Sequence, residues 1–202
     1  MNSKWKSFIK CAGFLAGLVL LVSLCDFFFA QSGYIRFILQ EVNEKDNNYD
    51  TIVLRASHAR SAIDPQKIDD VMGTNSINMA IPGETIKDSY YVLKESCRKN
   101  KVKKVILDVD YQYWVNPQTE GYFAEPFIYN QLSWTSPVKW QYMVDNMKTL
   151  DIRNAFTQRN VYLCSLSGAV KNAKFKTSST YFNHCIGDLT VSDANGPYVG
   201  KG

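Results

Sequence analysis

The segment Tyr49–Pro65, YDTIVLRASHARSAIDP, gives the first indication of how this chain folds. Its apolar run, Ile52–Leu54, is rich in β-branched residues, which favour a strand that is buried on both faces. Small and polar residues follow this run, and Asp64-Pro65 is a typical turn signal. A serine at the carboxyl end of a parallel strand lies where open α/β sheets place their ligands, so Ser57 is a candidate site residue. The alternative is that Ser57 only caps the helix that follows.

Two more strands are predicted downstream, and a helix precedes each of them. The predicted elements are a helix over 64–72 that stops at Gly73, a strand over 76–81, an amphipathic helix over 85–99 and a strand over 105–109. We expect the helix over 85–99 to bury one apolar face, which consists of Ile86, Tyr90, Leu93 and Cys97. Alternation of strands and helices over about sixty residues is typical of βαβ units, so we predict an α/β fold with a parallel sheet and right-handed crossovers.

Composition and charge narrow the functional classes. The 202 residues are 46% hydrophobic and 21% charged, as in a globular protein, and the net charge of +4 comes partly from lysines at the amino terminus. The chain has no arginine-rich run, so we expect no nucleic-acid partner. Its five cysteines show no CxxC spacing, so we expect no metal site and no cofactor. Cys164 and Cys185 form either a disulfide, if the domain is outside the cell, or two free thiols.

The amino-terminal segment Phe8–Ala30 is almost wholly apolar and is just long enough to span a bilayer. Lysines precede it and acidic residues follow it, which predicts a cytoplasmic amino terminus and an extracytoplasmic main domain. A cleaved signal peptide is the alternative. Because Phe27–Gln31 is a poor cleavage site, we favour an uncleaved, single-pass anchor in the cell membrane.

The rest of the chain contains fewer clear signals. Residues 34–45 have apolar side chains at helical spacing, and Ser136-Pro137 marks the start of a helix over 138–150, followed by a second helix over 152–163. We expect Trp140, Met143, Val144 and Met147 to face inward. The aromatic stretch 111–136 forms either a rim over a site or loose packing against the sheet. We divide the chain into a cytoplasmic tip and anchor (1–30), a juxtamembrane helix (31–48) and an α/β domain (49–202).

Three segments, each at the end of a predicted strand, resemble the sequence blocks of the SGNH (GDSL-like) hydrolases. Ser57 matches the nucleophile of that family, although Arg55-Ala56 replaces the usual Gly-Asp. The adjacent pair Ser57-His58 is similar to the membrane-anchored, cell-envelope branch of the superfamily. That branch includes the protein that acts in D-alanylation of lipoteichoic acid and the exopolysaccharide O-acetyltransferases.

The second block, Asn78–Thr85, matches the family pattern N-x-x-x-x-G-x-T, which implies that the backbone N–H of Gly83 contributes to an oxyanion hole. The third block lacks the asparagine of the family, and Gln112 stands about where that side-chain amide would be. The resemblance covers about residues 49–113 and implies a three-layer, flavodoxin-like α/β domain.

The family also uses an Asp-x-x-His near the carboxyl terminus as its base and orienting acid. In this chain Tyr181 stands where the aspartate would precede His184. We therefore expect the sequence to be the amino-terminal part of a longer protein, with a domain that is incomplete at its carboxyl end. By itself the chain should lack a general base for Ser57, so we expect the longer protein to be the enzyme and this chain alone to be inactive.

These observations predict a membrane-anchored serine esterase or acyltransferase that acts on acyl esters of a cell-envelope polysaccharide or teichoic-acid-like polymer. The expected nucleophile is Ser57, and the expected oxyanion or substrate-binding residues are Gly83, Asn78, Gln112 and His58. If the reaction is a transfer, we expect a multi-pass membrane acyltransferase as a partner. The alternative is a non-catalytic binding or assembly protein on the same fold, with the aromatic stretch Tyr111–Trp140 as a glycan-binding surface.

Overall fold

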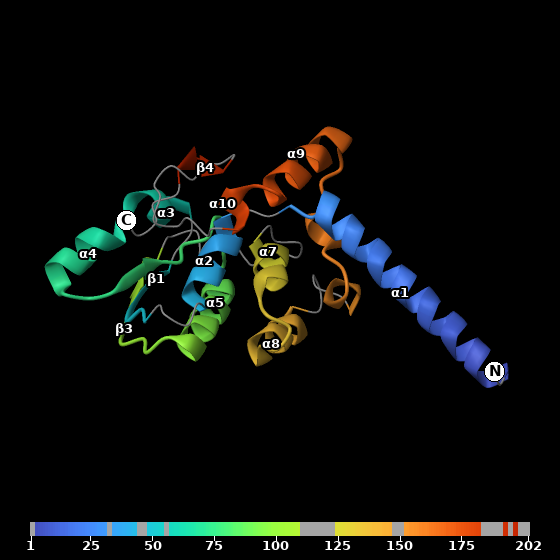
Figure 1. The fold of residues 1–202 in the computed structure, drawn as a ribbon. Helices are drawn as coiled ribbons and strands as arrows, with labels where there is room; N and C mark the ends of the chain where they lie inside the picture. The colour runs from blue at the N-terminus through green and yellow to red at the C-terminus, as the bar shows by residue number, and fades with distance from the viewer. Residues whose placement is uncertain are drawn as a thin grey trace.

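The computed structural model describes residues 3–31, 34–43, 48–54, 57–109, 124–146, 152–182, 192–193 and 196–197. The molecule is mostly helical and contains a small parallel sheet, with one long helix at its amino terminus (Figure 1). The first half consists of α1 (Ser3–Phe29), α2 (Tyr34–Asn43), β1 (Thr51–Leu54), α3 (Ser57–Ala62), α4 (Pro65–Met72), β2 (Ser76–Asn78), α5 (Ile86–Lys99) and β3 (Lys104–Leu107). The second half consists of α7 (Ala124–Gln131), α8 (Pro137–Asp145), the 3₁₀ turns η1 (Ile152–Ala155) and η2 (Arg159–Val161), α9 (Leu166–Lys176), α10 (Ser179–Phe182), β4 (Ser192–Asp193) and β5 (Gly196–Pro197).

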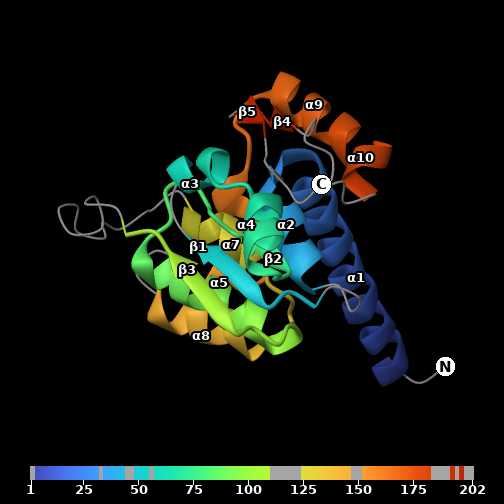
Figure 2. The ribbon, with the colours of Figure 1, turned by 90° about the vertical axis from the view of Figure 1, so that its left-hand side faces the viewer.

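The predicted parallel sheet is present, with the strand order β2-β1-β3. In its register Thr51 of β1 pairs with Ser76 of β2 on one side and with Lys104 of β3 on the other. In Figure 2, α5 and α8 lie behind the sheet, and α4 lies in front of it beside β2. All four residues of β1 are buried, as expected for a central strand, whereas Val105 and Leu107 of β3 are each 43% exposed.

Local capping signals place the helix between β1 and β2 as predicted. The side chain of Asp64 accepts a hydrogen bond from the backbone N–H of Gln66, and Pro65 occupies the first helical position. Gly73 ends α4 in a left-handed conformation (φ 62°) that glycine adopts without strain. The two flanking strands are shorter than predicted, because β2 ends at Asn78 and β3 ends at Leu107.

The prediction for the buried face of α5 was wrong for three of its four residues, and only Leu93 packs, partly buried, against the core. Ile86 and Tyr90 are 41% and 54% exposed, and Cys97 is exposed as well. The helix instead buries a largely polar face, which consists of Asp88, Ser89, Tyr91, Val92, Glu95 and Ser96. This face is stable inside the protein because its polar groups are hydrogen-bonded to partners on other segments. For example, the Ser136 hydroxyl donates to Glu95 Oε2 at 2.5 Å, and the Ser89 hydroxyl donates to Glu84 Oε1 at 2.6 Å.

The helix α8 begins at the predicted cap, where Ser136 Oγ accepts from the N–H of Val138 at 3.2 Å. Its inward side chains are Val138, Lys139, Tyr142 and Met143, so the prediction was right for Met143 and wrong for Trp140 and Val144, which are exposed. Met147 lies outside the described residues.

The predicted helix over 152–163 was also wrong. The segment forms η1 and η2, after which the chain becomes extended and Tyr162 pairs with Ala30 in an antiparallel bridge. This bridge removes the continuous i to i−4 hydrogen bonding that an α-helix requires. The helices α7 and α9 were not predicted from the sequence.

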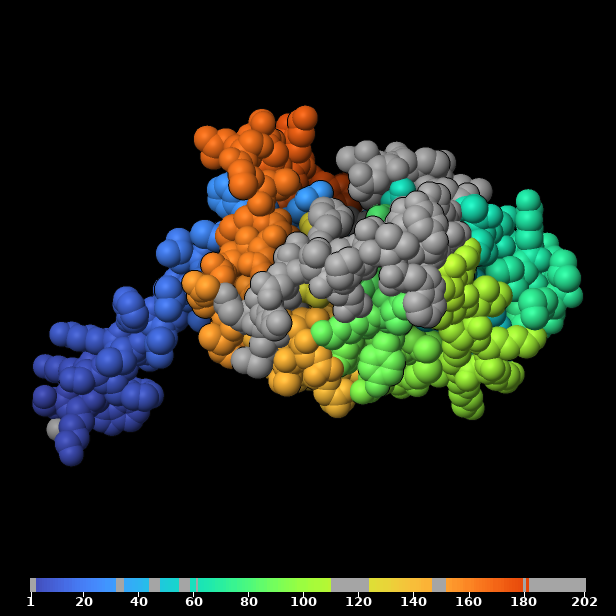
Figure 3. Space-filling view, turned by 180° about the vertical axis from the view of Figure 1, so that it is seen from behind, coloured from blue at the N-terminus to red at the C-terminus, as the bar shows by residue number. Residues whose placement is uncertain are grey.

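The amino-terminal helix α1 is 27 residues long, about 40 Å at 1.5 Å per residue, and is long and apolar enough to cross a membrane. None of its residues from Ser3 to Phe29 is buried. Its amino-terminal half projects away from the body of the molecule (Figures 1 and 3). In the described part of the chain, α1 contacts η2 and α9.

The carboxyl end of α1 is fixed by side chains from α9. The ammonium group of Lys176 donates to the carbonyls of Asp26, Phe27 and Ala30 at 2.8, 2.9 and 2.6 Å. The amide of Asn172 donates to the Ala30 carbonyl at 2.8 Å and reaches two further carbonyls of the same turn. The last carbonyls of a helix have no partners within the helix, and a cation there also complements the helix dipole. Burial lowers the pKa of Lys176 to about 8.

We predict that Lys176→Met weakens this joint because it leaves three carbonyls of the α1 end without their charged donor. The expected cost is about 2 kcal/mol in the free energy of unfolding. Chemical denaturation of the purified protein in detergent, followed by tryptophan fluorescence, measures it. Lys174→Met on the exposed side of α9 is the matched control and should change the midpoint little. Equal midpoints for both variants would contradict the assigned role of Lys176.

Candidate functional site

The carboxyl ends of β1 and β2 bring two of the predicted site residues to one edge of the sheet. The strands are parallel neighbours, so the segments that follow them leave the sheet on the same side (Figure 2). Ser57 is the first residue of α3 and follows the end of β1 by three positions. Gly83 lies in the turn between β2 and α5. This edge is where open α/β sheets carry their ligand sites.

Of the five predicted site residues, the structure describes Asn78 and Gly83 in full and only the backbone of Ser57 and His58. The side chains of Ser57 and His58, and all of Gln112, lie outside the described residues. His184 and Cys185 lie outside them too, while Cys164 is an exposed free thiol. Asn78 and Gly83 therefore provide the geometric information about this edge.

Asn78 holds the segment that begins at Ser57 in place. Its side chain is almost fully buried, and Nδ2 donates to the carbonyls of Ala59 and Ile63, both at 2.9 Å. Its Oδ1 accepts from the N–H of Ala80 at 3.1 Å. One amide thus joins α3, the turn after it and the loop that follows β2. Both amide hydrogens are used inside the protein, which gives Asn78 a positioning role.

Gly83 adopts a backbone conformation that few other residues tolerate. Its φ angle is 71°, in the left-handed region where a side chain causes strain. The turn closes with a hydrogen bond of 3.1 Å from the N–H of Glu84 to the carbonyl of Ile81. The N–H of Gly83 donates to no other residue in the described part of the chain. A backbone donor in a rigid turn is the kind of group that stabilises an oxyanion.

A buried hydrogen-bond network fixes the helix that follows this turn. Asp88 Oδ2 accepts two hydrogen bonds from Thr85, one from its N–H at 2.8 Å and one from its hydroxyl at 2.9 Å. In return, the N–H of Asp88 donates to Thr85 Oγ1, and these reciprocal bonds form a capping box at the start of α5. The Tyr142 hydroxyl donates to Asp88 Oδ1 at 2.5 Å and so joins α8 to the start of α5. Burial raises the pKa of Asp88, and burial together with the nearby Asp88 charge raises the pKa of Tyr142 well above its usual range.

We predict that Asn78→Ala destabilises the protein by about 2 to 3 kcal/mol, because the carbonyls of Ala59 and Ile63 and the N–H of Ala80 each lose a hydrogen bond. The variant should also loosen the turn that starts at Ser57. Hydrogen exchange of residues 57–63, together with the unfolding midpoint, measures both effects. Asn75→Ala is the control, since the Asn75 amide makes an exposed contact of 3.2 Å with the Asn48 carbonyl. Protection of residues 57–63 that is unchanged in Asn78→Ala would contradict this role.

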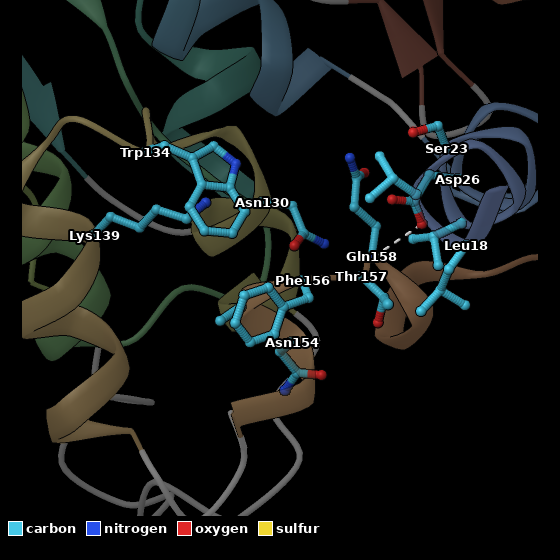
Figure 4. A pocket seen from close by; sticks show the side chains of 13 residues that line it. Leu18, Ser23, Asp26, Asn130, Trp134, Lys139, Asn154, Phe156, Thr157 and Gln158 are labelled. Atoms are coloured by element: carbon cyan, nitrogen blue, oxygen red, sulfur yellow. Dashed lines mark hydrogen bonds between the residues drawn. The ribbon is translucent and has the colours of Figure 1, made fainter. Parts of the chain in front are cut away.

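A second candidate site is a cavity of about 400 Å³ that lies between α1 and the segment from α7 to η2 (Figure 4). The labelled residues Leu18, Ser23 and Asp26 of α1 form one side of it, and Trp134, Phe156 and Asn154 lie on the opposite side. Uncharged amides and hydroxyls make up most of its polar lining. The lining residues are Leu18, Val19, Val22, Ser23, Asp26, Asn130, Trp134, Lys139 and Asn154–Gln158. No sequence pattern indicated this site, because its walls are far apart along the chain.

Lys139 is buried at the edge of this cavity and is only 3% exposed. Its ammonium group donates to the carbonyls of Tyr129 and Leu132, both at 2.9 Å, and so completes the carboxyl end of α7. The same group lies 4.3 Å from the ring centroid of Tyr129 and 5.2 Å from that of Trp134. Burial lowers the pKa of Lys139 to about 8.

This pKa predicts how stability depends on pH. The folded protein releases the Lys139 proton near pH 8, whereas the unfolded chain holds it up to the ordinary value of 10.5. Between these values the unfolded state binds more protons, so the free energy of unfolding rises with pH, by up to about 3 kcal/mol. Denaturation at pH 8 and pH 10 in the wild type and in Lys139→Met measures the difference in slope. Lys67→Met, at an exposed position, should keep the wild-type slope, and a Lys139→Met variant that also keeps it would contradict the prediction.

A third hollow is a shallow groove of about 420 Å³ on the outer surface of α5 and α8. Tyr90 and Trp140 line it and are 54% and 39% exposed. Gln141, Lys94 and Asp145 add polar groups. Exposed aromatic faces next to polar side chains are suited to flat, partly apolar ligands such as sugar rings.

Comparison with protein-family models, with curated proteins and with solved structures found no match for this chain. Among the described residues, no group of three or more His, Cys, Asp or Glu side chains is placed to hold a metal ion.

Proposed function

We propose that this protein is a membrane-anchored, SGNH-type serine esterase or acyltransferase that acts on acyl esters of a cell-envelope polymer. One observation carries the proposal: Ser57 and Gly83 follow the carboxyl ends of two adjacent parallel strands, β1 and β2. A nucleophile and a backbone oxyanion donor must lie close together, and this topology brings the two segments to one edge.

The arrangement of the strands supports the finer proposal of a three-layer, flavodoxin-like domain. The observed order β2-β1-β3 equals the first part of the flavodoxin-like order 2-1-3-4-5. In that order a fourth strand pairs with β3. The exposed apolar side chains of Val105 and Leu107 on β3 are consistent with such a neighbour.

In the proposed reaction the hydroxyl of Ser57 attacks the carbonyl carbon of the acyl ester, and the ester's alcohol leaves with a proton. The N–H of Gly83, the N–H of Ser57 and the amide of Gln112 would hold the negative charge that develops on the carbonyl oxygen. Each such donor is typically worth about 100- to 1000-fold in rate. The acyl group then passes from Ser57 to water in hydrolysis or to a polymer hydroxyl in transfer. His58 would contact the substrate, and a His from an Asp-x-x-His segment would supply the base.

The proposed location follows from α1. We place α1 across the cell membrane with its amino terminus in the cytoplasm, because lysines precede the apolar segment and acidic residues follow it. The main domain then lies outside the membrane, next to envelope polymers such as polysaccharides or teichoic acids. In the transfer reaction a multi-pass membrane acyltransferase would supply the acyl group.

We predict that Ser57→Ala lowers acyl-ester turnover by at least about 1000-fold, because the variant cannot form the acyl-enzyme. Membranes that contain the full protein are assayed with p-nitrophenyl acetate and with acetylated envelope polymer, and Ser57 is labelled with a fluorophosphonate probe. Ser133→Ala, at an exposed serine far along the chain, is the control and should keep the wild-type rate and labelling. Turnover that is equal in Ser57→Ala and the wild type would refute the proposal.

The second candidate function is a non-catalytic, envelope-binding or assembly protein, and the groove of Tyr90 and Trp140 is the observation that favours it. The same assay distinguishes the two functions. Polymer binding that survives Ser57→Ala but is lost in Trp140→Ala, without any Ser57-dependent turnover, would support the binding function.

A further inference from the structure

We infer that the exposed side chains of Trp134, Ile152 and Phe156 form a docking face that rests on the outer surface of the lipid bilayer which α1 crosses. This inference rests on the proposed membrane anchor and is independent of the chemistry proposed for Ser57. Four observations carry it: the length of α1 that lies beside the body, the hydrogen bond from Gln158 to α1, the apolar side chains exposed at that level, and the charge around them.

The part of α1 that lies before the cavity is too short to cross a bilayer. The first residue of α1 in the cavity lining is Leu18, so the segment Ser3–Gly17 precedes the lining. These 15 residues extend over about 22 Å and include three lysines, whereas the hydrocarbon core of a bilayer is about 30 Å thick. If α1 crosses the bilayer, Leu18 and Val22 must therefore also lie in the hydrocarbon.

A hydrogen bond to α1 fixes the level of the docking face. About 20 residues are needed to span the core, and counted from Cys11, which follows the last lysine, they extend to Ala30. Asp26 lies four positions before Ala30, about 6 Å along the helix, and so lies near the outer boundary of the hydrocarbon. The N–H of Gln158 donates to Asp26 Oδ1 at 3.1 Å. Phe156 is only two positions before Gln158, so the docking face lies at this boundary.

The side chains at this level are large, apolar and exposed. Trp134, Ile152 and Phe156 are 54%, 66% and 68% exposed. The ring centroids of Trp134 and Phe156 lie 6.3 Å apart, and both rings line the cavity across from Leu18 (Figure 4). Apolar side chains that are exposed together mark interaction surfaces, and tryptophan is enriched where proteins meet the surface of a bilayer. Contact with lipid would remove these side chains from water.

The charge around the docking face favours a bilayer surface over a second copy of the chain. Arg153 on η1 and Arg159 on η2 are both exposed, and residues 152–163 include no acidic side chain. An arginine at a membrane surface keeps its stem along apolar groups and its guanidinium among the headgroups, where phosphates attract it. In a symmetric dimer the same face would meet itself and bring these arginines together, which is unfavourable.

The test uses the full chain in liposomes of phosphatidylethanolamine and phosphatidylglycerol, with the photoreactive residue p-benzoylphenylalanine at one position at a time. At position 156 we expect a covalent phospholipid adduct, measured by mass spectrometry, that is at least about tenfold more abundant than at position 72. Met72 is the matched control, because it is 47% exposed at the end of α4, far from the amino terminus of α1 (Figure 1). Trp134→Glu should lower the adduct at position 156 by about tenfold, since it puts a charge on the docking face, and Met72→Glu should leave it unchanged.

A third position separates this inference from the proposed anchor. Phe14 is 72% exposed on α1, so p-benzoylphenylalanine at position 14 should give a phospholipid adduct if α1 spans the bilayer. An adduct at position 14 but none at position 156 would overturn the docking face and leave the anchor intact, while none at either position would overturn both. A crosslink from position 156 to a second copy of the chain, in place of lipid, would show a protein interface and overturn the inference as well. Ser57→Ala should leave every adduct unchanged, so failure of the proposed reaction would remain distinguishable.

Discussion

The hydrogen bonds that Lys176 and Asn172 make to the carboxyl end of α1 fix the position of this helix relative to the rest of the molecule. Without them the carbonyls of Phe27, Phe28 and Ala30 would lose the side-chain donors that the structure gives them. With them, a helix that projects from the body is held at one fixed position, and the antiparallel bridge between Ala30 and Tyr162 reinforces the joint. The cavity depends on this joint, because α1 forms one of its two walls.

Local chemistry explains which elements could be predicted from the sequence. Asp64 and Gly73 mark the ends of α4, and Ser136 marks the start of α8, because caps and left-handed residues act through neighbours only a few positions away. The β-branched run of β1 predicts a buried strand for a similar reason. The positions of Ser57 and Gly83 at one edge of the sheet also follow from the alternation of strands and helices, since parallel strands end on the same side.

What could not be predicted depends on partners far along the chain. Periodicity assumes that the apolar face of a helix is the buried one, but α5 buries Asp88 and Glu95 because Tyr142 and Ser136, 54 and 41 positions away, satisfy their carboxylates. The positioning role of Asn78 depends in the same way on carbonyls of α3.

The short connection between α1 and α2 has a mechanical consequence. Only four residues separate Phe29 from Tyr34, and the end of α1 is already fixed to η2 and α9. The chain therefore has no long linker here that would let the rest of the protein move relative to α1. If α1 spans the bilayer, the edge of the sheet that carries Ser57 stays at one height above the lipid surface. The protein then works within a thin layer parallel to the membrane, and envelope polymers must enter that layer to be reached.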